Sequence, residues 1–344
     1  MTVSTDSIRA QERLDAARAG DEDAFNVLVG AHRGELEAHC YRMLGSLQDA
    51  EDAVQETLLR AWRGLADFER RSSLRTWLYR IATNVCLNSI ALRPRRFVPT
   101  DYGPRSEDAT DPGQPLVESV WIEPYPDGKL DLGSGYAGPE ARYEQREAIE
   151  LAFIAALQHL PATQRAVLIL REVLGFSAKE VSESLETSVA SVNSALQRAR
   201  KTVRARLPER SQQATLRSLG DDRTRELVER YMDAWARGDV EAVAALLAED
   251  AVFSMPPWPG WWKGRETIAQ FAKDAQETVA DSRGVPVRAS GQVAVAYYLV
   301  DRETARRKAA AIDVLTFDGP LIKEITAFIR PELFPSFGLP TELS

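Results

Sequence analysis

Basic, aromatic and amide side chains alternate on a helix predicted to begin at Ser73. Around its apolar stripe stand Arg75, Trp77, Arg80 and Asn84. Aromatic faces stack on unpaired bases, cations follow phosphates, and an amide can hydrogen-bond a base edge. This combination favours contact with single-stranded nucleic acid. The alternative is an ordinary core helix with two partly buried aromatic side chains, and the segment taken alone favours that alternative.

A second basic surface is predicted between residues 172 and 207, where two helix patterns are separated by a very short break. Ser177 and Glu180 form a capping-box pattern that marks the start of the first helix. Thr187 or Ser188 can cap the second, which places Val192, Leu196, Ala199 and Val203 on one stripe opposite a polar, basic face. This is the pattern of a helix-turn-helix. DNA binding is favoured over a plain helical hairpin because residues 196–210 carry six basic side chains and one acidic one.

Two further helices are predicted upstream. Apolar residues recur at helical spacing across residues 21–45, and Ser46 opens a helix that runs to Leu65. The second helix carries an acidic and amide face opposite its apolar stripe. A charged face is usually only solvated, but beside a nucleic-acid-binding candidate it could contact a basic protein partner.

Composition restricts the class of protein. A chain of 344 residues with 44% hydrophobic and 27% charged residues is expected to form two or three soluble domains. No apolar run reaches the roughly 18 residues of a membrane span, and no signal core is seen, so a cytoplasmic protein is expected. The net charge of −8 argues against tight, unaided binding to duplex DNA. Cys40 and Cys86 are predicted to be buried free thiols, and no metal-ligand spacing is present.

The stretches DAEDAVQETLLRAW and FERRSSLRTWLYRIATNVCLN, followed by the helix-turn-helix, resemble the extracytoplasmic-function sigma factors of bacterial RNA polymerase. The likeness covers residues 15–96 as sigma domain two and residues 140–207 as sigma domain four. In that family the acidic helix binds the clamp helices of the large polymerase subunit. The resemblance therefore implies a polymerase-binding role for Asp49, Asp52, Gln55 and Glu56.

The resemblance also implies two sets of DNA contacts. Domain two captures a base flipped from the minus-ten element, which points to Phe68, Arg71, Ser72, Arg75, Trp77, Arg80 and Asn84. Domain four reads the minus-thirty-five element, which points to Ser188, Ser191, Asn193, Ser194, Gln197, Arg198 and Lys201. Many members carry lysine and arginine where this chain has Asn193 and Ala195. The base sequence that it reads is therefore not implied.

Residues 97–139 are predicted to form an acidic linker rich in proline and glycine. The linker contains one apolar island with Trp121, Ile122 and Tyr125, and exposing it would cost about 25 cal/mol per Å². Docking elsewhere in the chain and local packing on a neighbouring helix are equally favoured. If the island docks on the C-terminal domain, it would fix the relative placement of the two sigma domains and so set activity.

Residues 222–335 are predicted to form an α+β cone, with helices followed by strands near 285–290, 292–301, 308–317 and 321–329. The stretches GDVEAVAALLAEDAVF and DVLTFDGPLIKEI resemble the SnoaL-like polyketide cyclase and ketosteroid isomerase superfamily, whose fold can enclose an apolar cavity. The candidate lining residues are Tyr231, Trp235, Phe253, Met255, Trp258, Trp261, Trp262 and Asp313. A buried carboxylate at Asp313 could act as an acid or base. The segment nevertheless contains no histidine, no cysteine and no second polar partner at a convincing spacing.

The sequence therefore predicts two all-α domains followed by an α+β cone, in a sigma factor regulated by its own C-terminal domain. A protein-docking role for that domain is favoured over ligand sensing, and ligand sensing over catalysis. No enzyme activity, catalytic residue, metal or cofactor is expected. The expected partners are core RNA polymerase and promoter DNA, with a small ligand of the C-terminal domain as a further candidate. The rival interpretations are a helix-turn-helix regulator fused to a small-molecule-converting or ligand-sensing domain, and a repressor that binds its operator alone.

Overall fold

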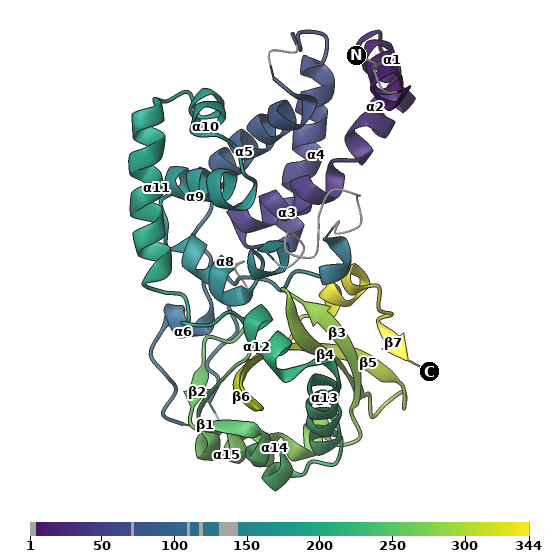
Figure 1. The fold of residues 1–344 in the computed structure, drawn as a ribbon. Helices are drawn as coiled ribbons and strands as arrows, with labels where there is room; N and C mark the ends of the chain where they lie inside the picture. Colours follow the sequence, from purple (N-terminus) through teal and green to yellow (C-terminus); the bar gives the residue numbers. More distant parts are fainter. Residues whose placement is uncertain (1–4, 70–71, 109–110, 117–119, 131–143, 344) are drawn as a thin grey trace. The chain divides into compact units, whose positions relative to one another are not determined.

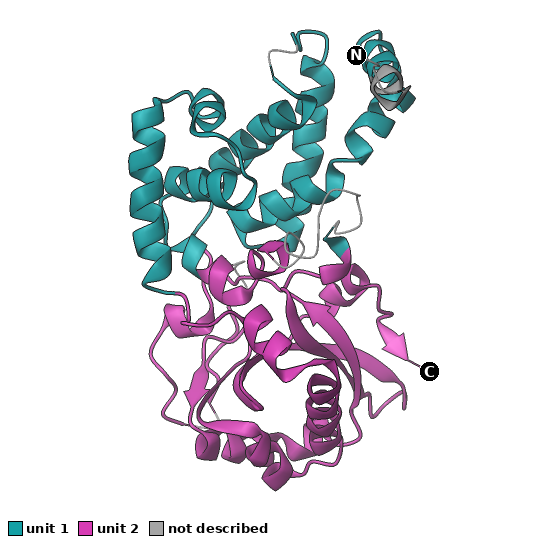
Figure 2. Cartoon of the chain, in the orientation of Figure 1, with its two compact units in different colours: residues 1–95, 129–134, 156–206 teal, residues 96–128, 135–155, 207–344 magenta. Residues whose placement is uncertain are grey.

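The computed structural model describes residues 5–69, 72–108, 111–116, 120–130 and 144–343 (Figure 1). The chain forms two compact units (Figure 2). The first contains residues 1–95, 129–134 and 156–206, and the second contains residues 96–128, 135–155 and 207–344. Neither unit is a continuous piece of chain. Among the described residues, no helix is both long and apolar enough to cross a membrane.

The first unit begins with α1 (Thr5–Arg18), α2 (Glu22–Gly30), α3 (Arg33–Leu44), α4 (Leu47–Gly64) and α5 (Leu74–Leu92). The single helix expected across residues 21–45 was wrong. Gly30, a poor helix former, ends α2, and α3 begins after His32, whose ring pairs with Glu35 one turn later. The predicted start of α4 is confirmed, because the Ser46 side chain accepts the Asp49 N–H. Cys40 and Cys86 are buried free thiols, as predicted.

The helix-turn-helix prediction is confirmed in the rest of the first unit, which contains α9 (Ala162–Leu168), η2 (Ile169–Val173), α10 (Ala178–Ser184) and α11 (Val189–Arg204). Ser177 and Glu180 make the reciprocal hydrogen bonds of a capping box at the start of α10. The predicted apolar stripe of α11 is buried. The preceding helix, α8 (Leu151–Gln158), contains a boundary between the two units.

The second unit is a curved sheet with helices against one face (Figure 1). The strands lie in the order β2-β1-β6-β5-β4-β3, with β1 and β6 parallel and the other neighbours antiparallel. The predicted strands are present. The elements are α6 (Pro99–Tyr102), η1 (Asp127–Lys129), α12 (Gln212–Leu219), α13 (Asp221–Ala236), α14 (Val240–Leu246), β1 (Leu247–Ser254), β2 (Trp261–Lys263), α15 (Arg265–Val279), β3 (Arg283–Ala289), β4 (Gln292–Val300), β5 (Arg307–Asp318), β6 (Leu321–Phe328), η3 (Pro331–Phe337) and β7 (Glu342–Leu343), which pairs with β5.

The apolar island of the linker lies on this sheet unit, and residues 120–126 are all buried. The Trp121 indole donates its N–H to the Pro257 carbonyl at 3.0 Å. Tyr125 and Ser290 are joined by two hydrogen bonds. The Ser290 N–H donates to the Tyr125 carbonyl at 2.6 Å, and the Tyr125 N–H donates to Ser290 Oγ at 3.0 Å. The island is therefore part of the core of this unit.

The chain that precedes α8 is also fixed to the sheet unit. The Glu150 carboxylate accepts the N–H groups of Gln212 and Gln213, at 3.1 and 2.8 Å, and so caps the start of α12. The Gln292 amide oxygen on β4 accepts the Leu151 N–H at 3.1 Å. Burial raises the pKa of Glu150 to about 7, although the two backbone hydrogen bonds oppose the shift.

Replacing Glu150 with glutamine should flatten the pH dependence of stability. The pKa of Glu150 rises from 4.5 to about 7 on folding. The folded state therefore binds the proton more tightly than the unfolded state, and stability falls as pH rises through this window and is constant above it. The Glu150→Gln variant does not titrate, so its fall in unfolding free energy between pH 5 and pH 8 should be smaller by up to about 3 kcal/mol.

Urea unfolding followed by tryptophan fluorescence measures this difference. Asp313, whose pKa is also raised to about 7, contributes a fall in the same pH range and remains in the variant. Parallel pH profiles for the wild type and the Glu150→Gln variant would contradict the prediction.

Candidate nucleic-acid and polymerase surfaces and a cavity in the sheet unit

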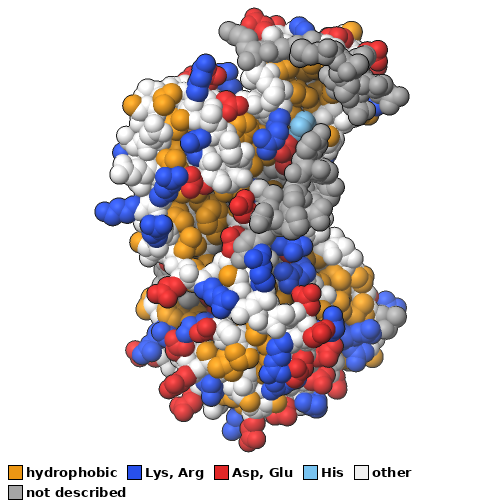
Figure 3. Space-filling model, in the orientation of Figure 1, with side chains coloured by type: hydrophobic (Ala, Val, Ile, Leu, Met, Phe, Trp, Pro, Cys, Tyr) orange, Lys and Arg blue, Asp and Glu red, His pale blue; other side chains and the backbone are white. Residues whose placement is uncertain are grey.

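The outer face of α11 is the most open of the predicted surfaces. Ser188 caps the helix by accepting the Ser191 N–H at 3.1 Å. The side chains predicted to read the minus-thirty-five element are all exposed: Ser188, Ser191, Asn193, Ser194, Gln197, Arg198 and Lys201. Figure 3 shows lysine and arginine side chains gathered along this edge of the first unit. The arrangement presents hydroxyl and amide groups at the helix start and positive charge further along.

The residues predicted to contact the minus-ten element are in more varied surroundings. Ser72 and Arg80 are exposed, whereas Trp77 and Asn84 are partly buried. Phe68 is buried and packs on Trp77, with ring centroids 4.9 Å apart. Arg71 lies outside the described residues. Phe68 is therefore placed to support the Trp77 ring rather than to contact DNA directly.

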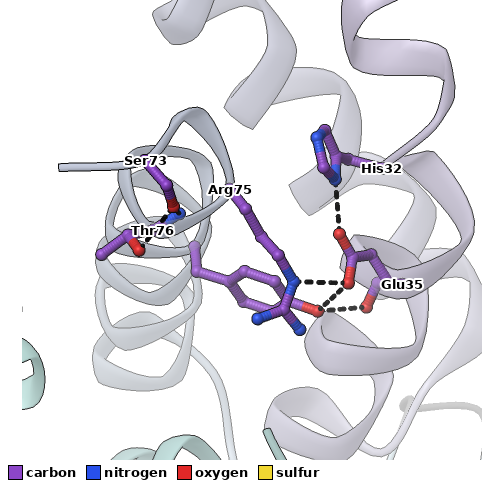
Figure 4. Close-up of polar contacts among 6 residues, drawn as sticks. His32, Glu35, Ser73, Arg75 and Thr76 are labelled. Atoms are coloured by element: carbon purple, nitrogen blue, oxygen red, sulfur yellow. Dashed lines mark hydrogen bonds and ion pairs between the residues drawn. The ribbon is translucent and has the colours of Figure 1, made fainter. Parts of the chain in front are cut away.

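Arg75 belongs to a polar cluster on the surface between α3 and α5 (Figure 4). The Glu35 carboxylate accepts hydrogen bonds from Arg75 Nε at 2.9 Å and from the Tyr79 hydroxyl at 3.2 Å, and it pairs with His32 Nδ1 at 2.5 Å. Burial acts to raise the pKa of Glu35, but the His32 contact and the Arg75 charge outweigh it, so the pKa is lower than usual. Arg75 is therefore an anchored cation.

The same face of α5 meets the second half of the first unit. The Arg75 guanidinium lies 5.2 Å from the ring centroid of Phe176, and Arg80 pairs with Glu186 at 3.1 Å. The buried Arg165 donates to the Met43 and Leu160 carbonyls and to the Gln158 side chain and carbonyl. These contacts connect α9 and the α10 region to α3 and α5, so full exposure of this face requires them to break.

The acidic face of α4 is partly accessible. Asp52 and Gln55 are exposed, and Glu56 is partly exposed and pairs with Arg60 at 2.6 Å. Asp49 differs, because it is almost fully buried and pairs with Arg93. Of the four predicted polymerase-binding residues, Asp52, Gln55 and Glu56 can reach a partner directly.

The sheet unit contains a cavity of about 330 Å³. Its lining includes five of the predicted residues, namely Trp235, Phe253, Met255, Trp258 and Asp313. Tyr231, Trp261 and Trp262 do not line it. Tyr231 lies beside Asp313, and its hydroxyl donates a hydrogen bond to the carboxylate at 2.7 Å. The indole N–H groups of Trp261 and Trp262 instead donate to the linker carbonyls of Gly103 and Asp108, at 2.9 and 2.8 Å.

Three polar lining residues were missed by the sequence interpretation, Thr278, Ser282 and Tyr297. Strand alternation could have found Tyr297, because Val295 pairs with Asp313 and Tyr297 is two residues further along β4 on the same face. Burial raises the pKa of Asp313 to about 7, although the hydrogen bond from Tyr231 opposes the shift. Among the described residues, no cluster of three or more side chains could hold a metal ion.

Comparison with protein families gives a class for each part of the chain. Residues 28–96 match Sigma-70 region 2, and residues 150–203 match Sigma-70 region 4. Residues 228–325 match the SnoaL-like domain. The chain thus combines two sigma regions with a C-terminal SnoaL-like domain, which is the fold class that the sequence predicted.

Whole-chain comparisons are more specific. The chain is 40% identical over 331 residues to the ECF RNA polymerase sigma factor SigG of Mycobacterium tuberculosis, covering 95% of this chain and 86% of that protein. It is 30% identical over 197 residues to the ECF sigma factor SigW of Bacillus subtilis, covering 57% of this chain and 96% of SigW. The crystal structure of the M. tuberculosis sigma factor SigJ shows the same fold, with a TM-score of 0.57, 22% identity, and coverage of 90% of this chain and 98% of SigJ.

The chain therefore belongs to the extracytoplasmic-function RNA polymerase sigma factors, as its motifs indicated. The alternative of a helix-turn-helix regulator fused to an enzyme domain is not favoured, because a relative that matches almost the whole chain is a sigma factor.

Removing the buried Arg165 should loosen α9 from α3. An Arg165→Met substitution leaves several buried carbonyl oxygens without their donor, and each buried acceptor left unsatisfied costs about 1–3 kcal/mol. Hydrogen exchange should accelerate in α9 and at the end of α3 while α5 keeps its protection. The matched control is Arg200→Met, which breaks an exposed pair with Glu172 and should change exchange little. Equal, small effects of the two substitutions would contradict this account.

Proposed function

We propose that this sigma factor directs core RNA polymerase to promoters through three separate surfaces of its first unit. The observation that carries the proposal is the exposed polar and basic face of α11 on a capped helix-turn-helix. In a member of this family, such a face is suited to the minus-thirty-five element in the major groove. The mechanism is binding and positioning, and no bond is made or broken by the sigma factor.

The other two surfaces divide polymerase binding from promoter opening. Asp52, Gln55 and Glu56 offer an acidic face on α4 for a basic surface of the polymerase. On α5, Trp77 supplies a ring for stacking and Asn84 an amide for a base edge. The net charge of −8 makes unaided binding to duplex DNA weak, so core polymerase must contribute to specific binding.

Substitutions on these two surfaces should produce different defects. Asp52→Lys should weaken binding to core polymerase by about tenfold or more, because it places like charges together; a tenfold change corresponds to about 1.4 kcal/mol. Asn84→Ala should leave that binding near normal and reduce promoter opening, since a lost base-edge contact costs about 1–3 kcal/mol.

Competition binding to core polymerase and permanganate reactivity of the melted promoter measure the two effects. The control is Asp23→Lys, which makes the same charge change at an exposed position on α2. The same defect from Asp52→Lys and Asn84→Ala would refute the division of roles. So would an equal loss of polymerase binding in Asp23→Lys.

We further propose that the SnoaL-like domain restrains the sigma factor through the linker. The segment between the two sigma regions is paired with the sheet unit at several points. The Ser106 and Leu116 N–H groups donate to the Trp261 and Pro257 carbonyls, at 2.8 and 3.0 Å, and the island around Trp121 is buried. A linker held in this way cannot extend, and extension is needed if the two sigma regions are to separate and expose the α5 face.

Breaking the island contact should therefore raise transcription. The double substitution Trp121→Ala with Tyr125→Ala removes two rings that are 3% and 0% exposed, so docking of the segment should be lost. Run-off transcription with core polymerase should show more transcript per sigma factor at limiting concentration. Trp121→Phe, which keeps an aromatic ring and loses only the indole hydrogen bond, should remain closer to the wild type. Unchanged transcription by a folded double variant would exclude the restraint.

A further inference from the structure

The cavity of the SnoaL-like domain is built between the concave face of the sheet and the helices. Its wall is mostly aromatic and aliphatic, with rings from Phe253 on β1, Phe271 on α15 and Trp258 in the turn before β2. The volume of about 330 Å³ lies at the lower end of the roughly 300–1,000 Å³ found for small-molecule sites. The space suits a compact molecule of one or two rings.

Two hydroxyl groups in this wall are buried without a partner. Ser282 is 7% exposed and Tyr297 is 6% exposed, and neither hydroxyl has a hydrogen-bond partner among the described residues. Among the described residues, the Trp235 indole N–H also has no hydrogen-bond partner of standard geometry, although it is close enough to the Tyr231 hydroxyl to lower that group's pKa. Buried polar groups are normally satisfied, so a cluster of unsatisfied ones in a cavity indicates a missing partner.

The lining also limits the charge of that partner. Among the described residues, no lysine, arginine or histidine lines the cavity, and Asp313 is the only carboxylic acid in its lining. Above pH 7, where Asp313 with its pKa of about 7 is mostly ionised, an anion would therefore meet a carboxylate with no cation to offset it. Burial and the Asp313 charge raise the pKa of Tyr297, so its hydroxyl keeps its proton and can donate. An indole N–H can only donate, which disfavours an ammonium ligand beside Trp235.

We propose that this cavity binds a neutral, largely apolar molecule whose carbonyl or similar acceptor oxygen is held by the Tyr297 and Ser282 hydroxyls. Aromatic rings of the wall contact the apolar body. Asp313, paired with Tyr231, disfavours anionic ligands.

The linker contributes to the same wall through Pro112. The Gly260 N–H donates to the Pro112 carbonyl at 3.0 Å, between Trp258 in the turn and Trp261 at the start of β2. A side chain at Gly260 would lie 2.8 Å from that carbonyl oxygen, so this close approach needs glycine. A molecule in the cavity therefore contacts the linker segment itself, which gives it a route to the restraint proposed above.

Direct binding to the full chain tests the site with acetylnaphthalene as the probe. The comparison set is ethylnaphthalene, which lacks the oxygen, naphthoate, which is anionic, and naphthylmethylammonium, which is cationic. Calorimetry should show that the ketone binds about three- to tenfold more tightly than the hydrocarbon, as one or two hydrogen bonds would give. It should also bind more tightly than either ion.

Two tyrosines next to each other in sequence provide a matched pair of variants. Tyr297→Phe removes the cavity hydroxyl and should bring the ketone and the hydrocarbon to nearly equal affinity. Tyr298→Phe removes a hydroxyl that bonds the Pro340 carbonyl and does not line the cavity, so the preference for the ketone should persist. No binding of any probe, equal binding of ketone and hydrocarbon to the wild type, or a preference for either ion would overturn the proposal.

Hydrogen exchange separates this inference from the proposed function. Saturation with acetylnaphthalene should slow exchange of the Ser106 and Leu116 amides, which pair the linker with the turn. Binding without this protection would overturn the link between cavity and linker. The run-off experiment with the Trp121 and Tyr125 variants would then still test the restraint of the sigma factor independently. If these amides are protected but transcription does not change, the link between cavity and linker stands and the proposed restraint of the sigma factor is wrong.

Discussion

The backbone pairing between the linker and the SnoaL-like domain fixes the chain between the two sigma regions to the sheet unit. Buried N–H and C=O groups must find partners, and the linker finds them on the turn before β2 and on Ser290 after β3. Releasing it would unpair these groups and expose the rings of Trp121 and Tyr125 at the same time. The C-terminal domain therefore packs directly on the segment between the two sigma regions. Because this contact is intramolecular, its effective concentration is near millimolar.

A second constraint operates inside the first unit, where the anchored cation and the buried guanidinium have different roles. Arg75 is held by Glu35, which fixes the orientation of a partly exposed positive charge on the α5 surface. Arg165 is committed to carbonyl oxygens of its surroundings and cannot serve DNA. The same residue type thus prepares a binding surface at one position and joins helices at the other.

Much of the fold could be predicted because local patterns decide it. Capping at Ser46 and Ser177 and the stripe of α11 each depend on residues within one or two turns. The break after Gly30 was not predicted, because the apolar spacing continues across it and only the glycine itself marks the helix end. The accessibility of a site residue was harder to predict where its partner lies far away in the sequence. Asp49 forms an ion pair with Arg93, and the indoles of Trp261 and Trp262 donate hydrogen bonds to linker carbonyls. No short-range pattern encodes such pairings.

The aromatic residues in and after the turn before β2 contact both the cavity and the linker. Trp258 faces the cavity, whereas the Trp262 indole bonds the linker at Asp108 while its ring packs on Phe271, with centroids 5.0 Å apart. Phe271 itself lines the cavity, so one ring separates the cavity from a residue that binds the linker. Close-packed interiors transmit small displacements, because neighbouring rings cannot overlap. A molecule that displaced Phe271 would therefore act on the linker through a single intervening side chain, Trp262, and this short path connects the cavity to the restraint proposed above.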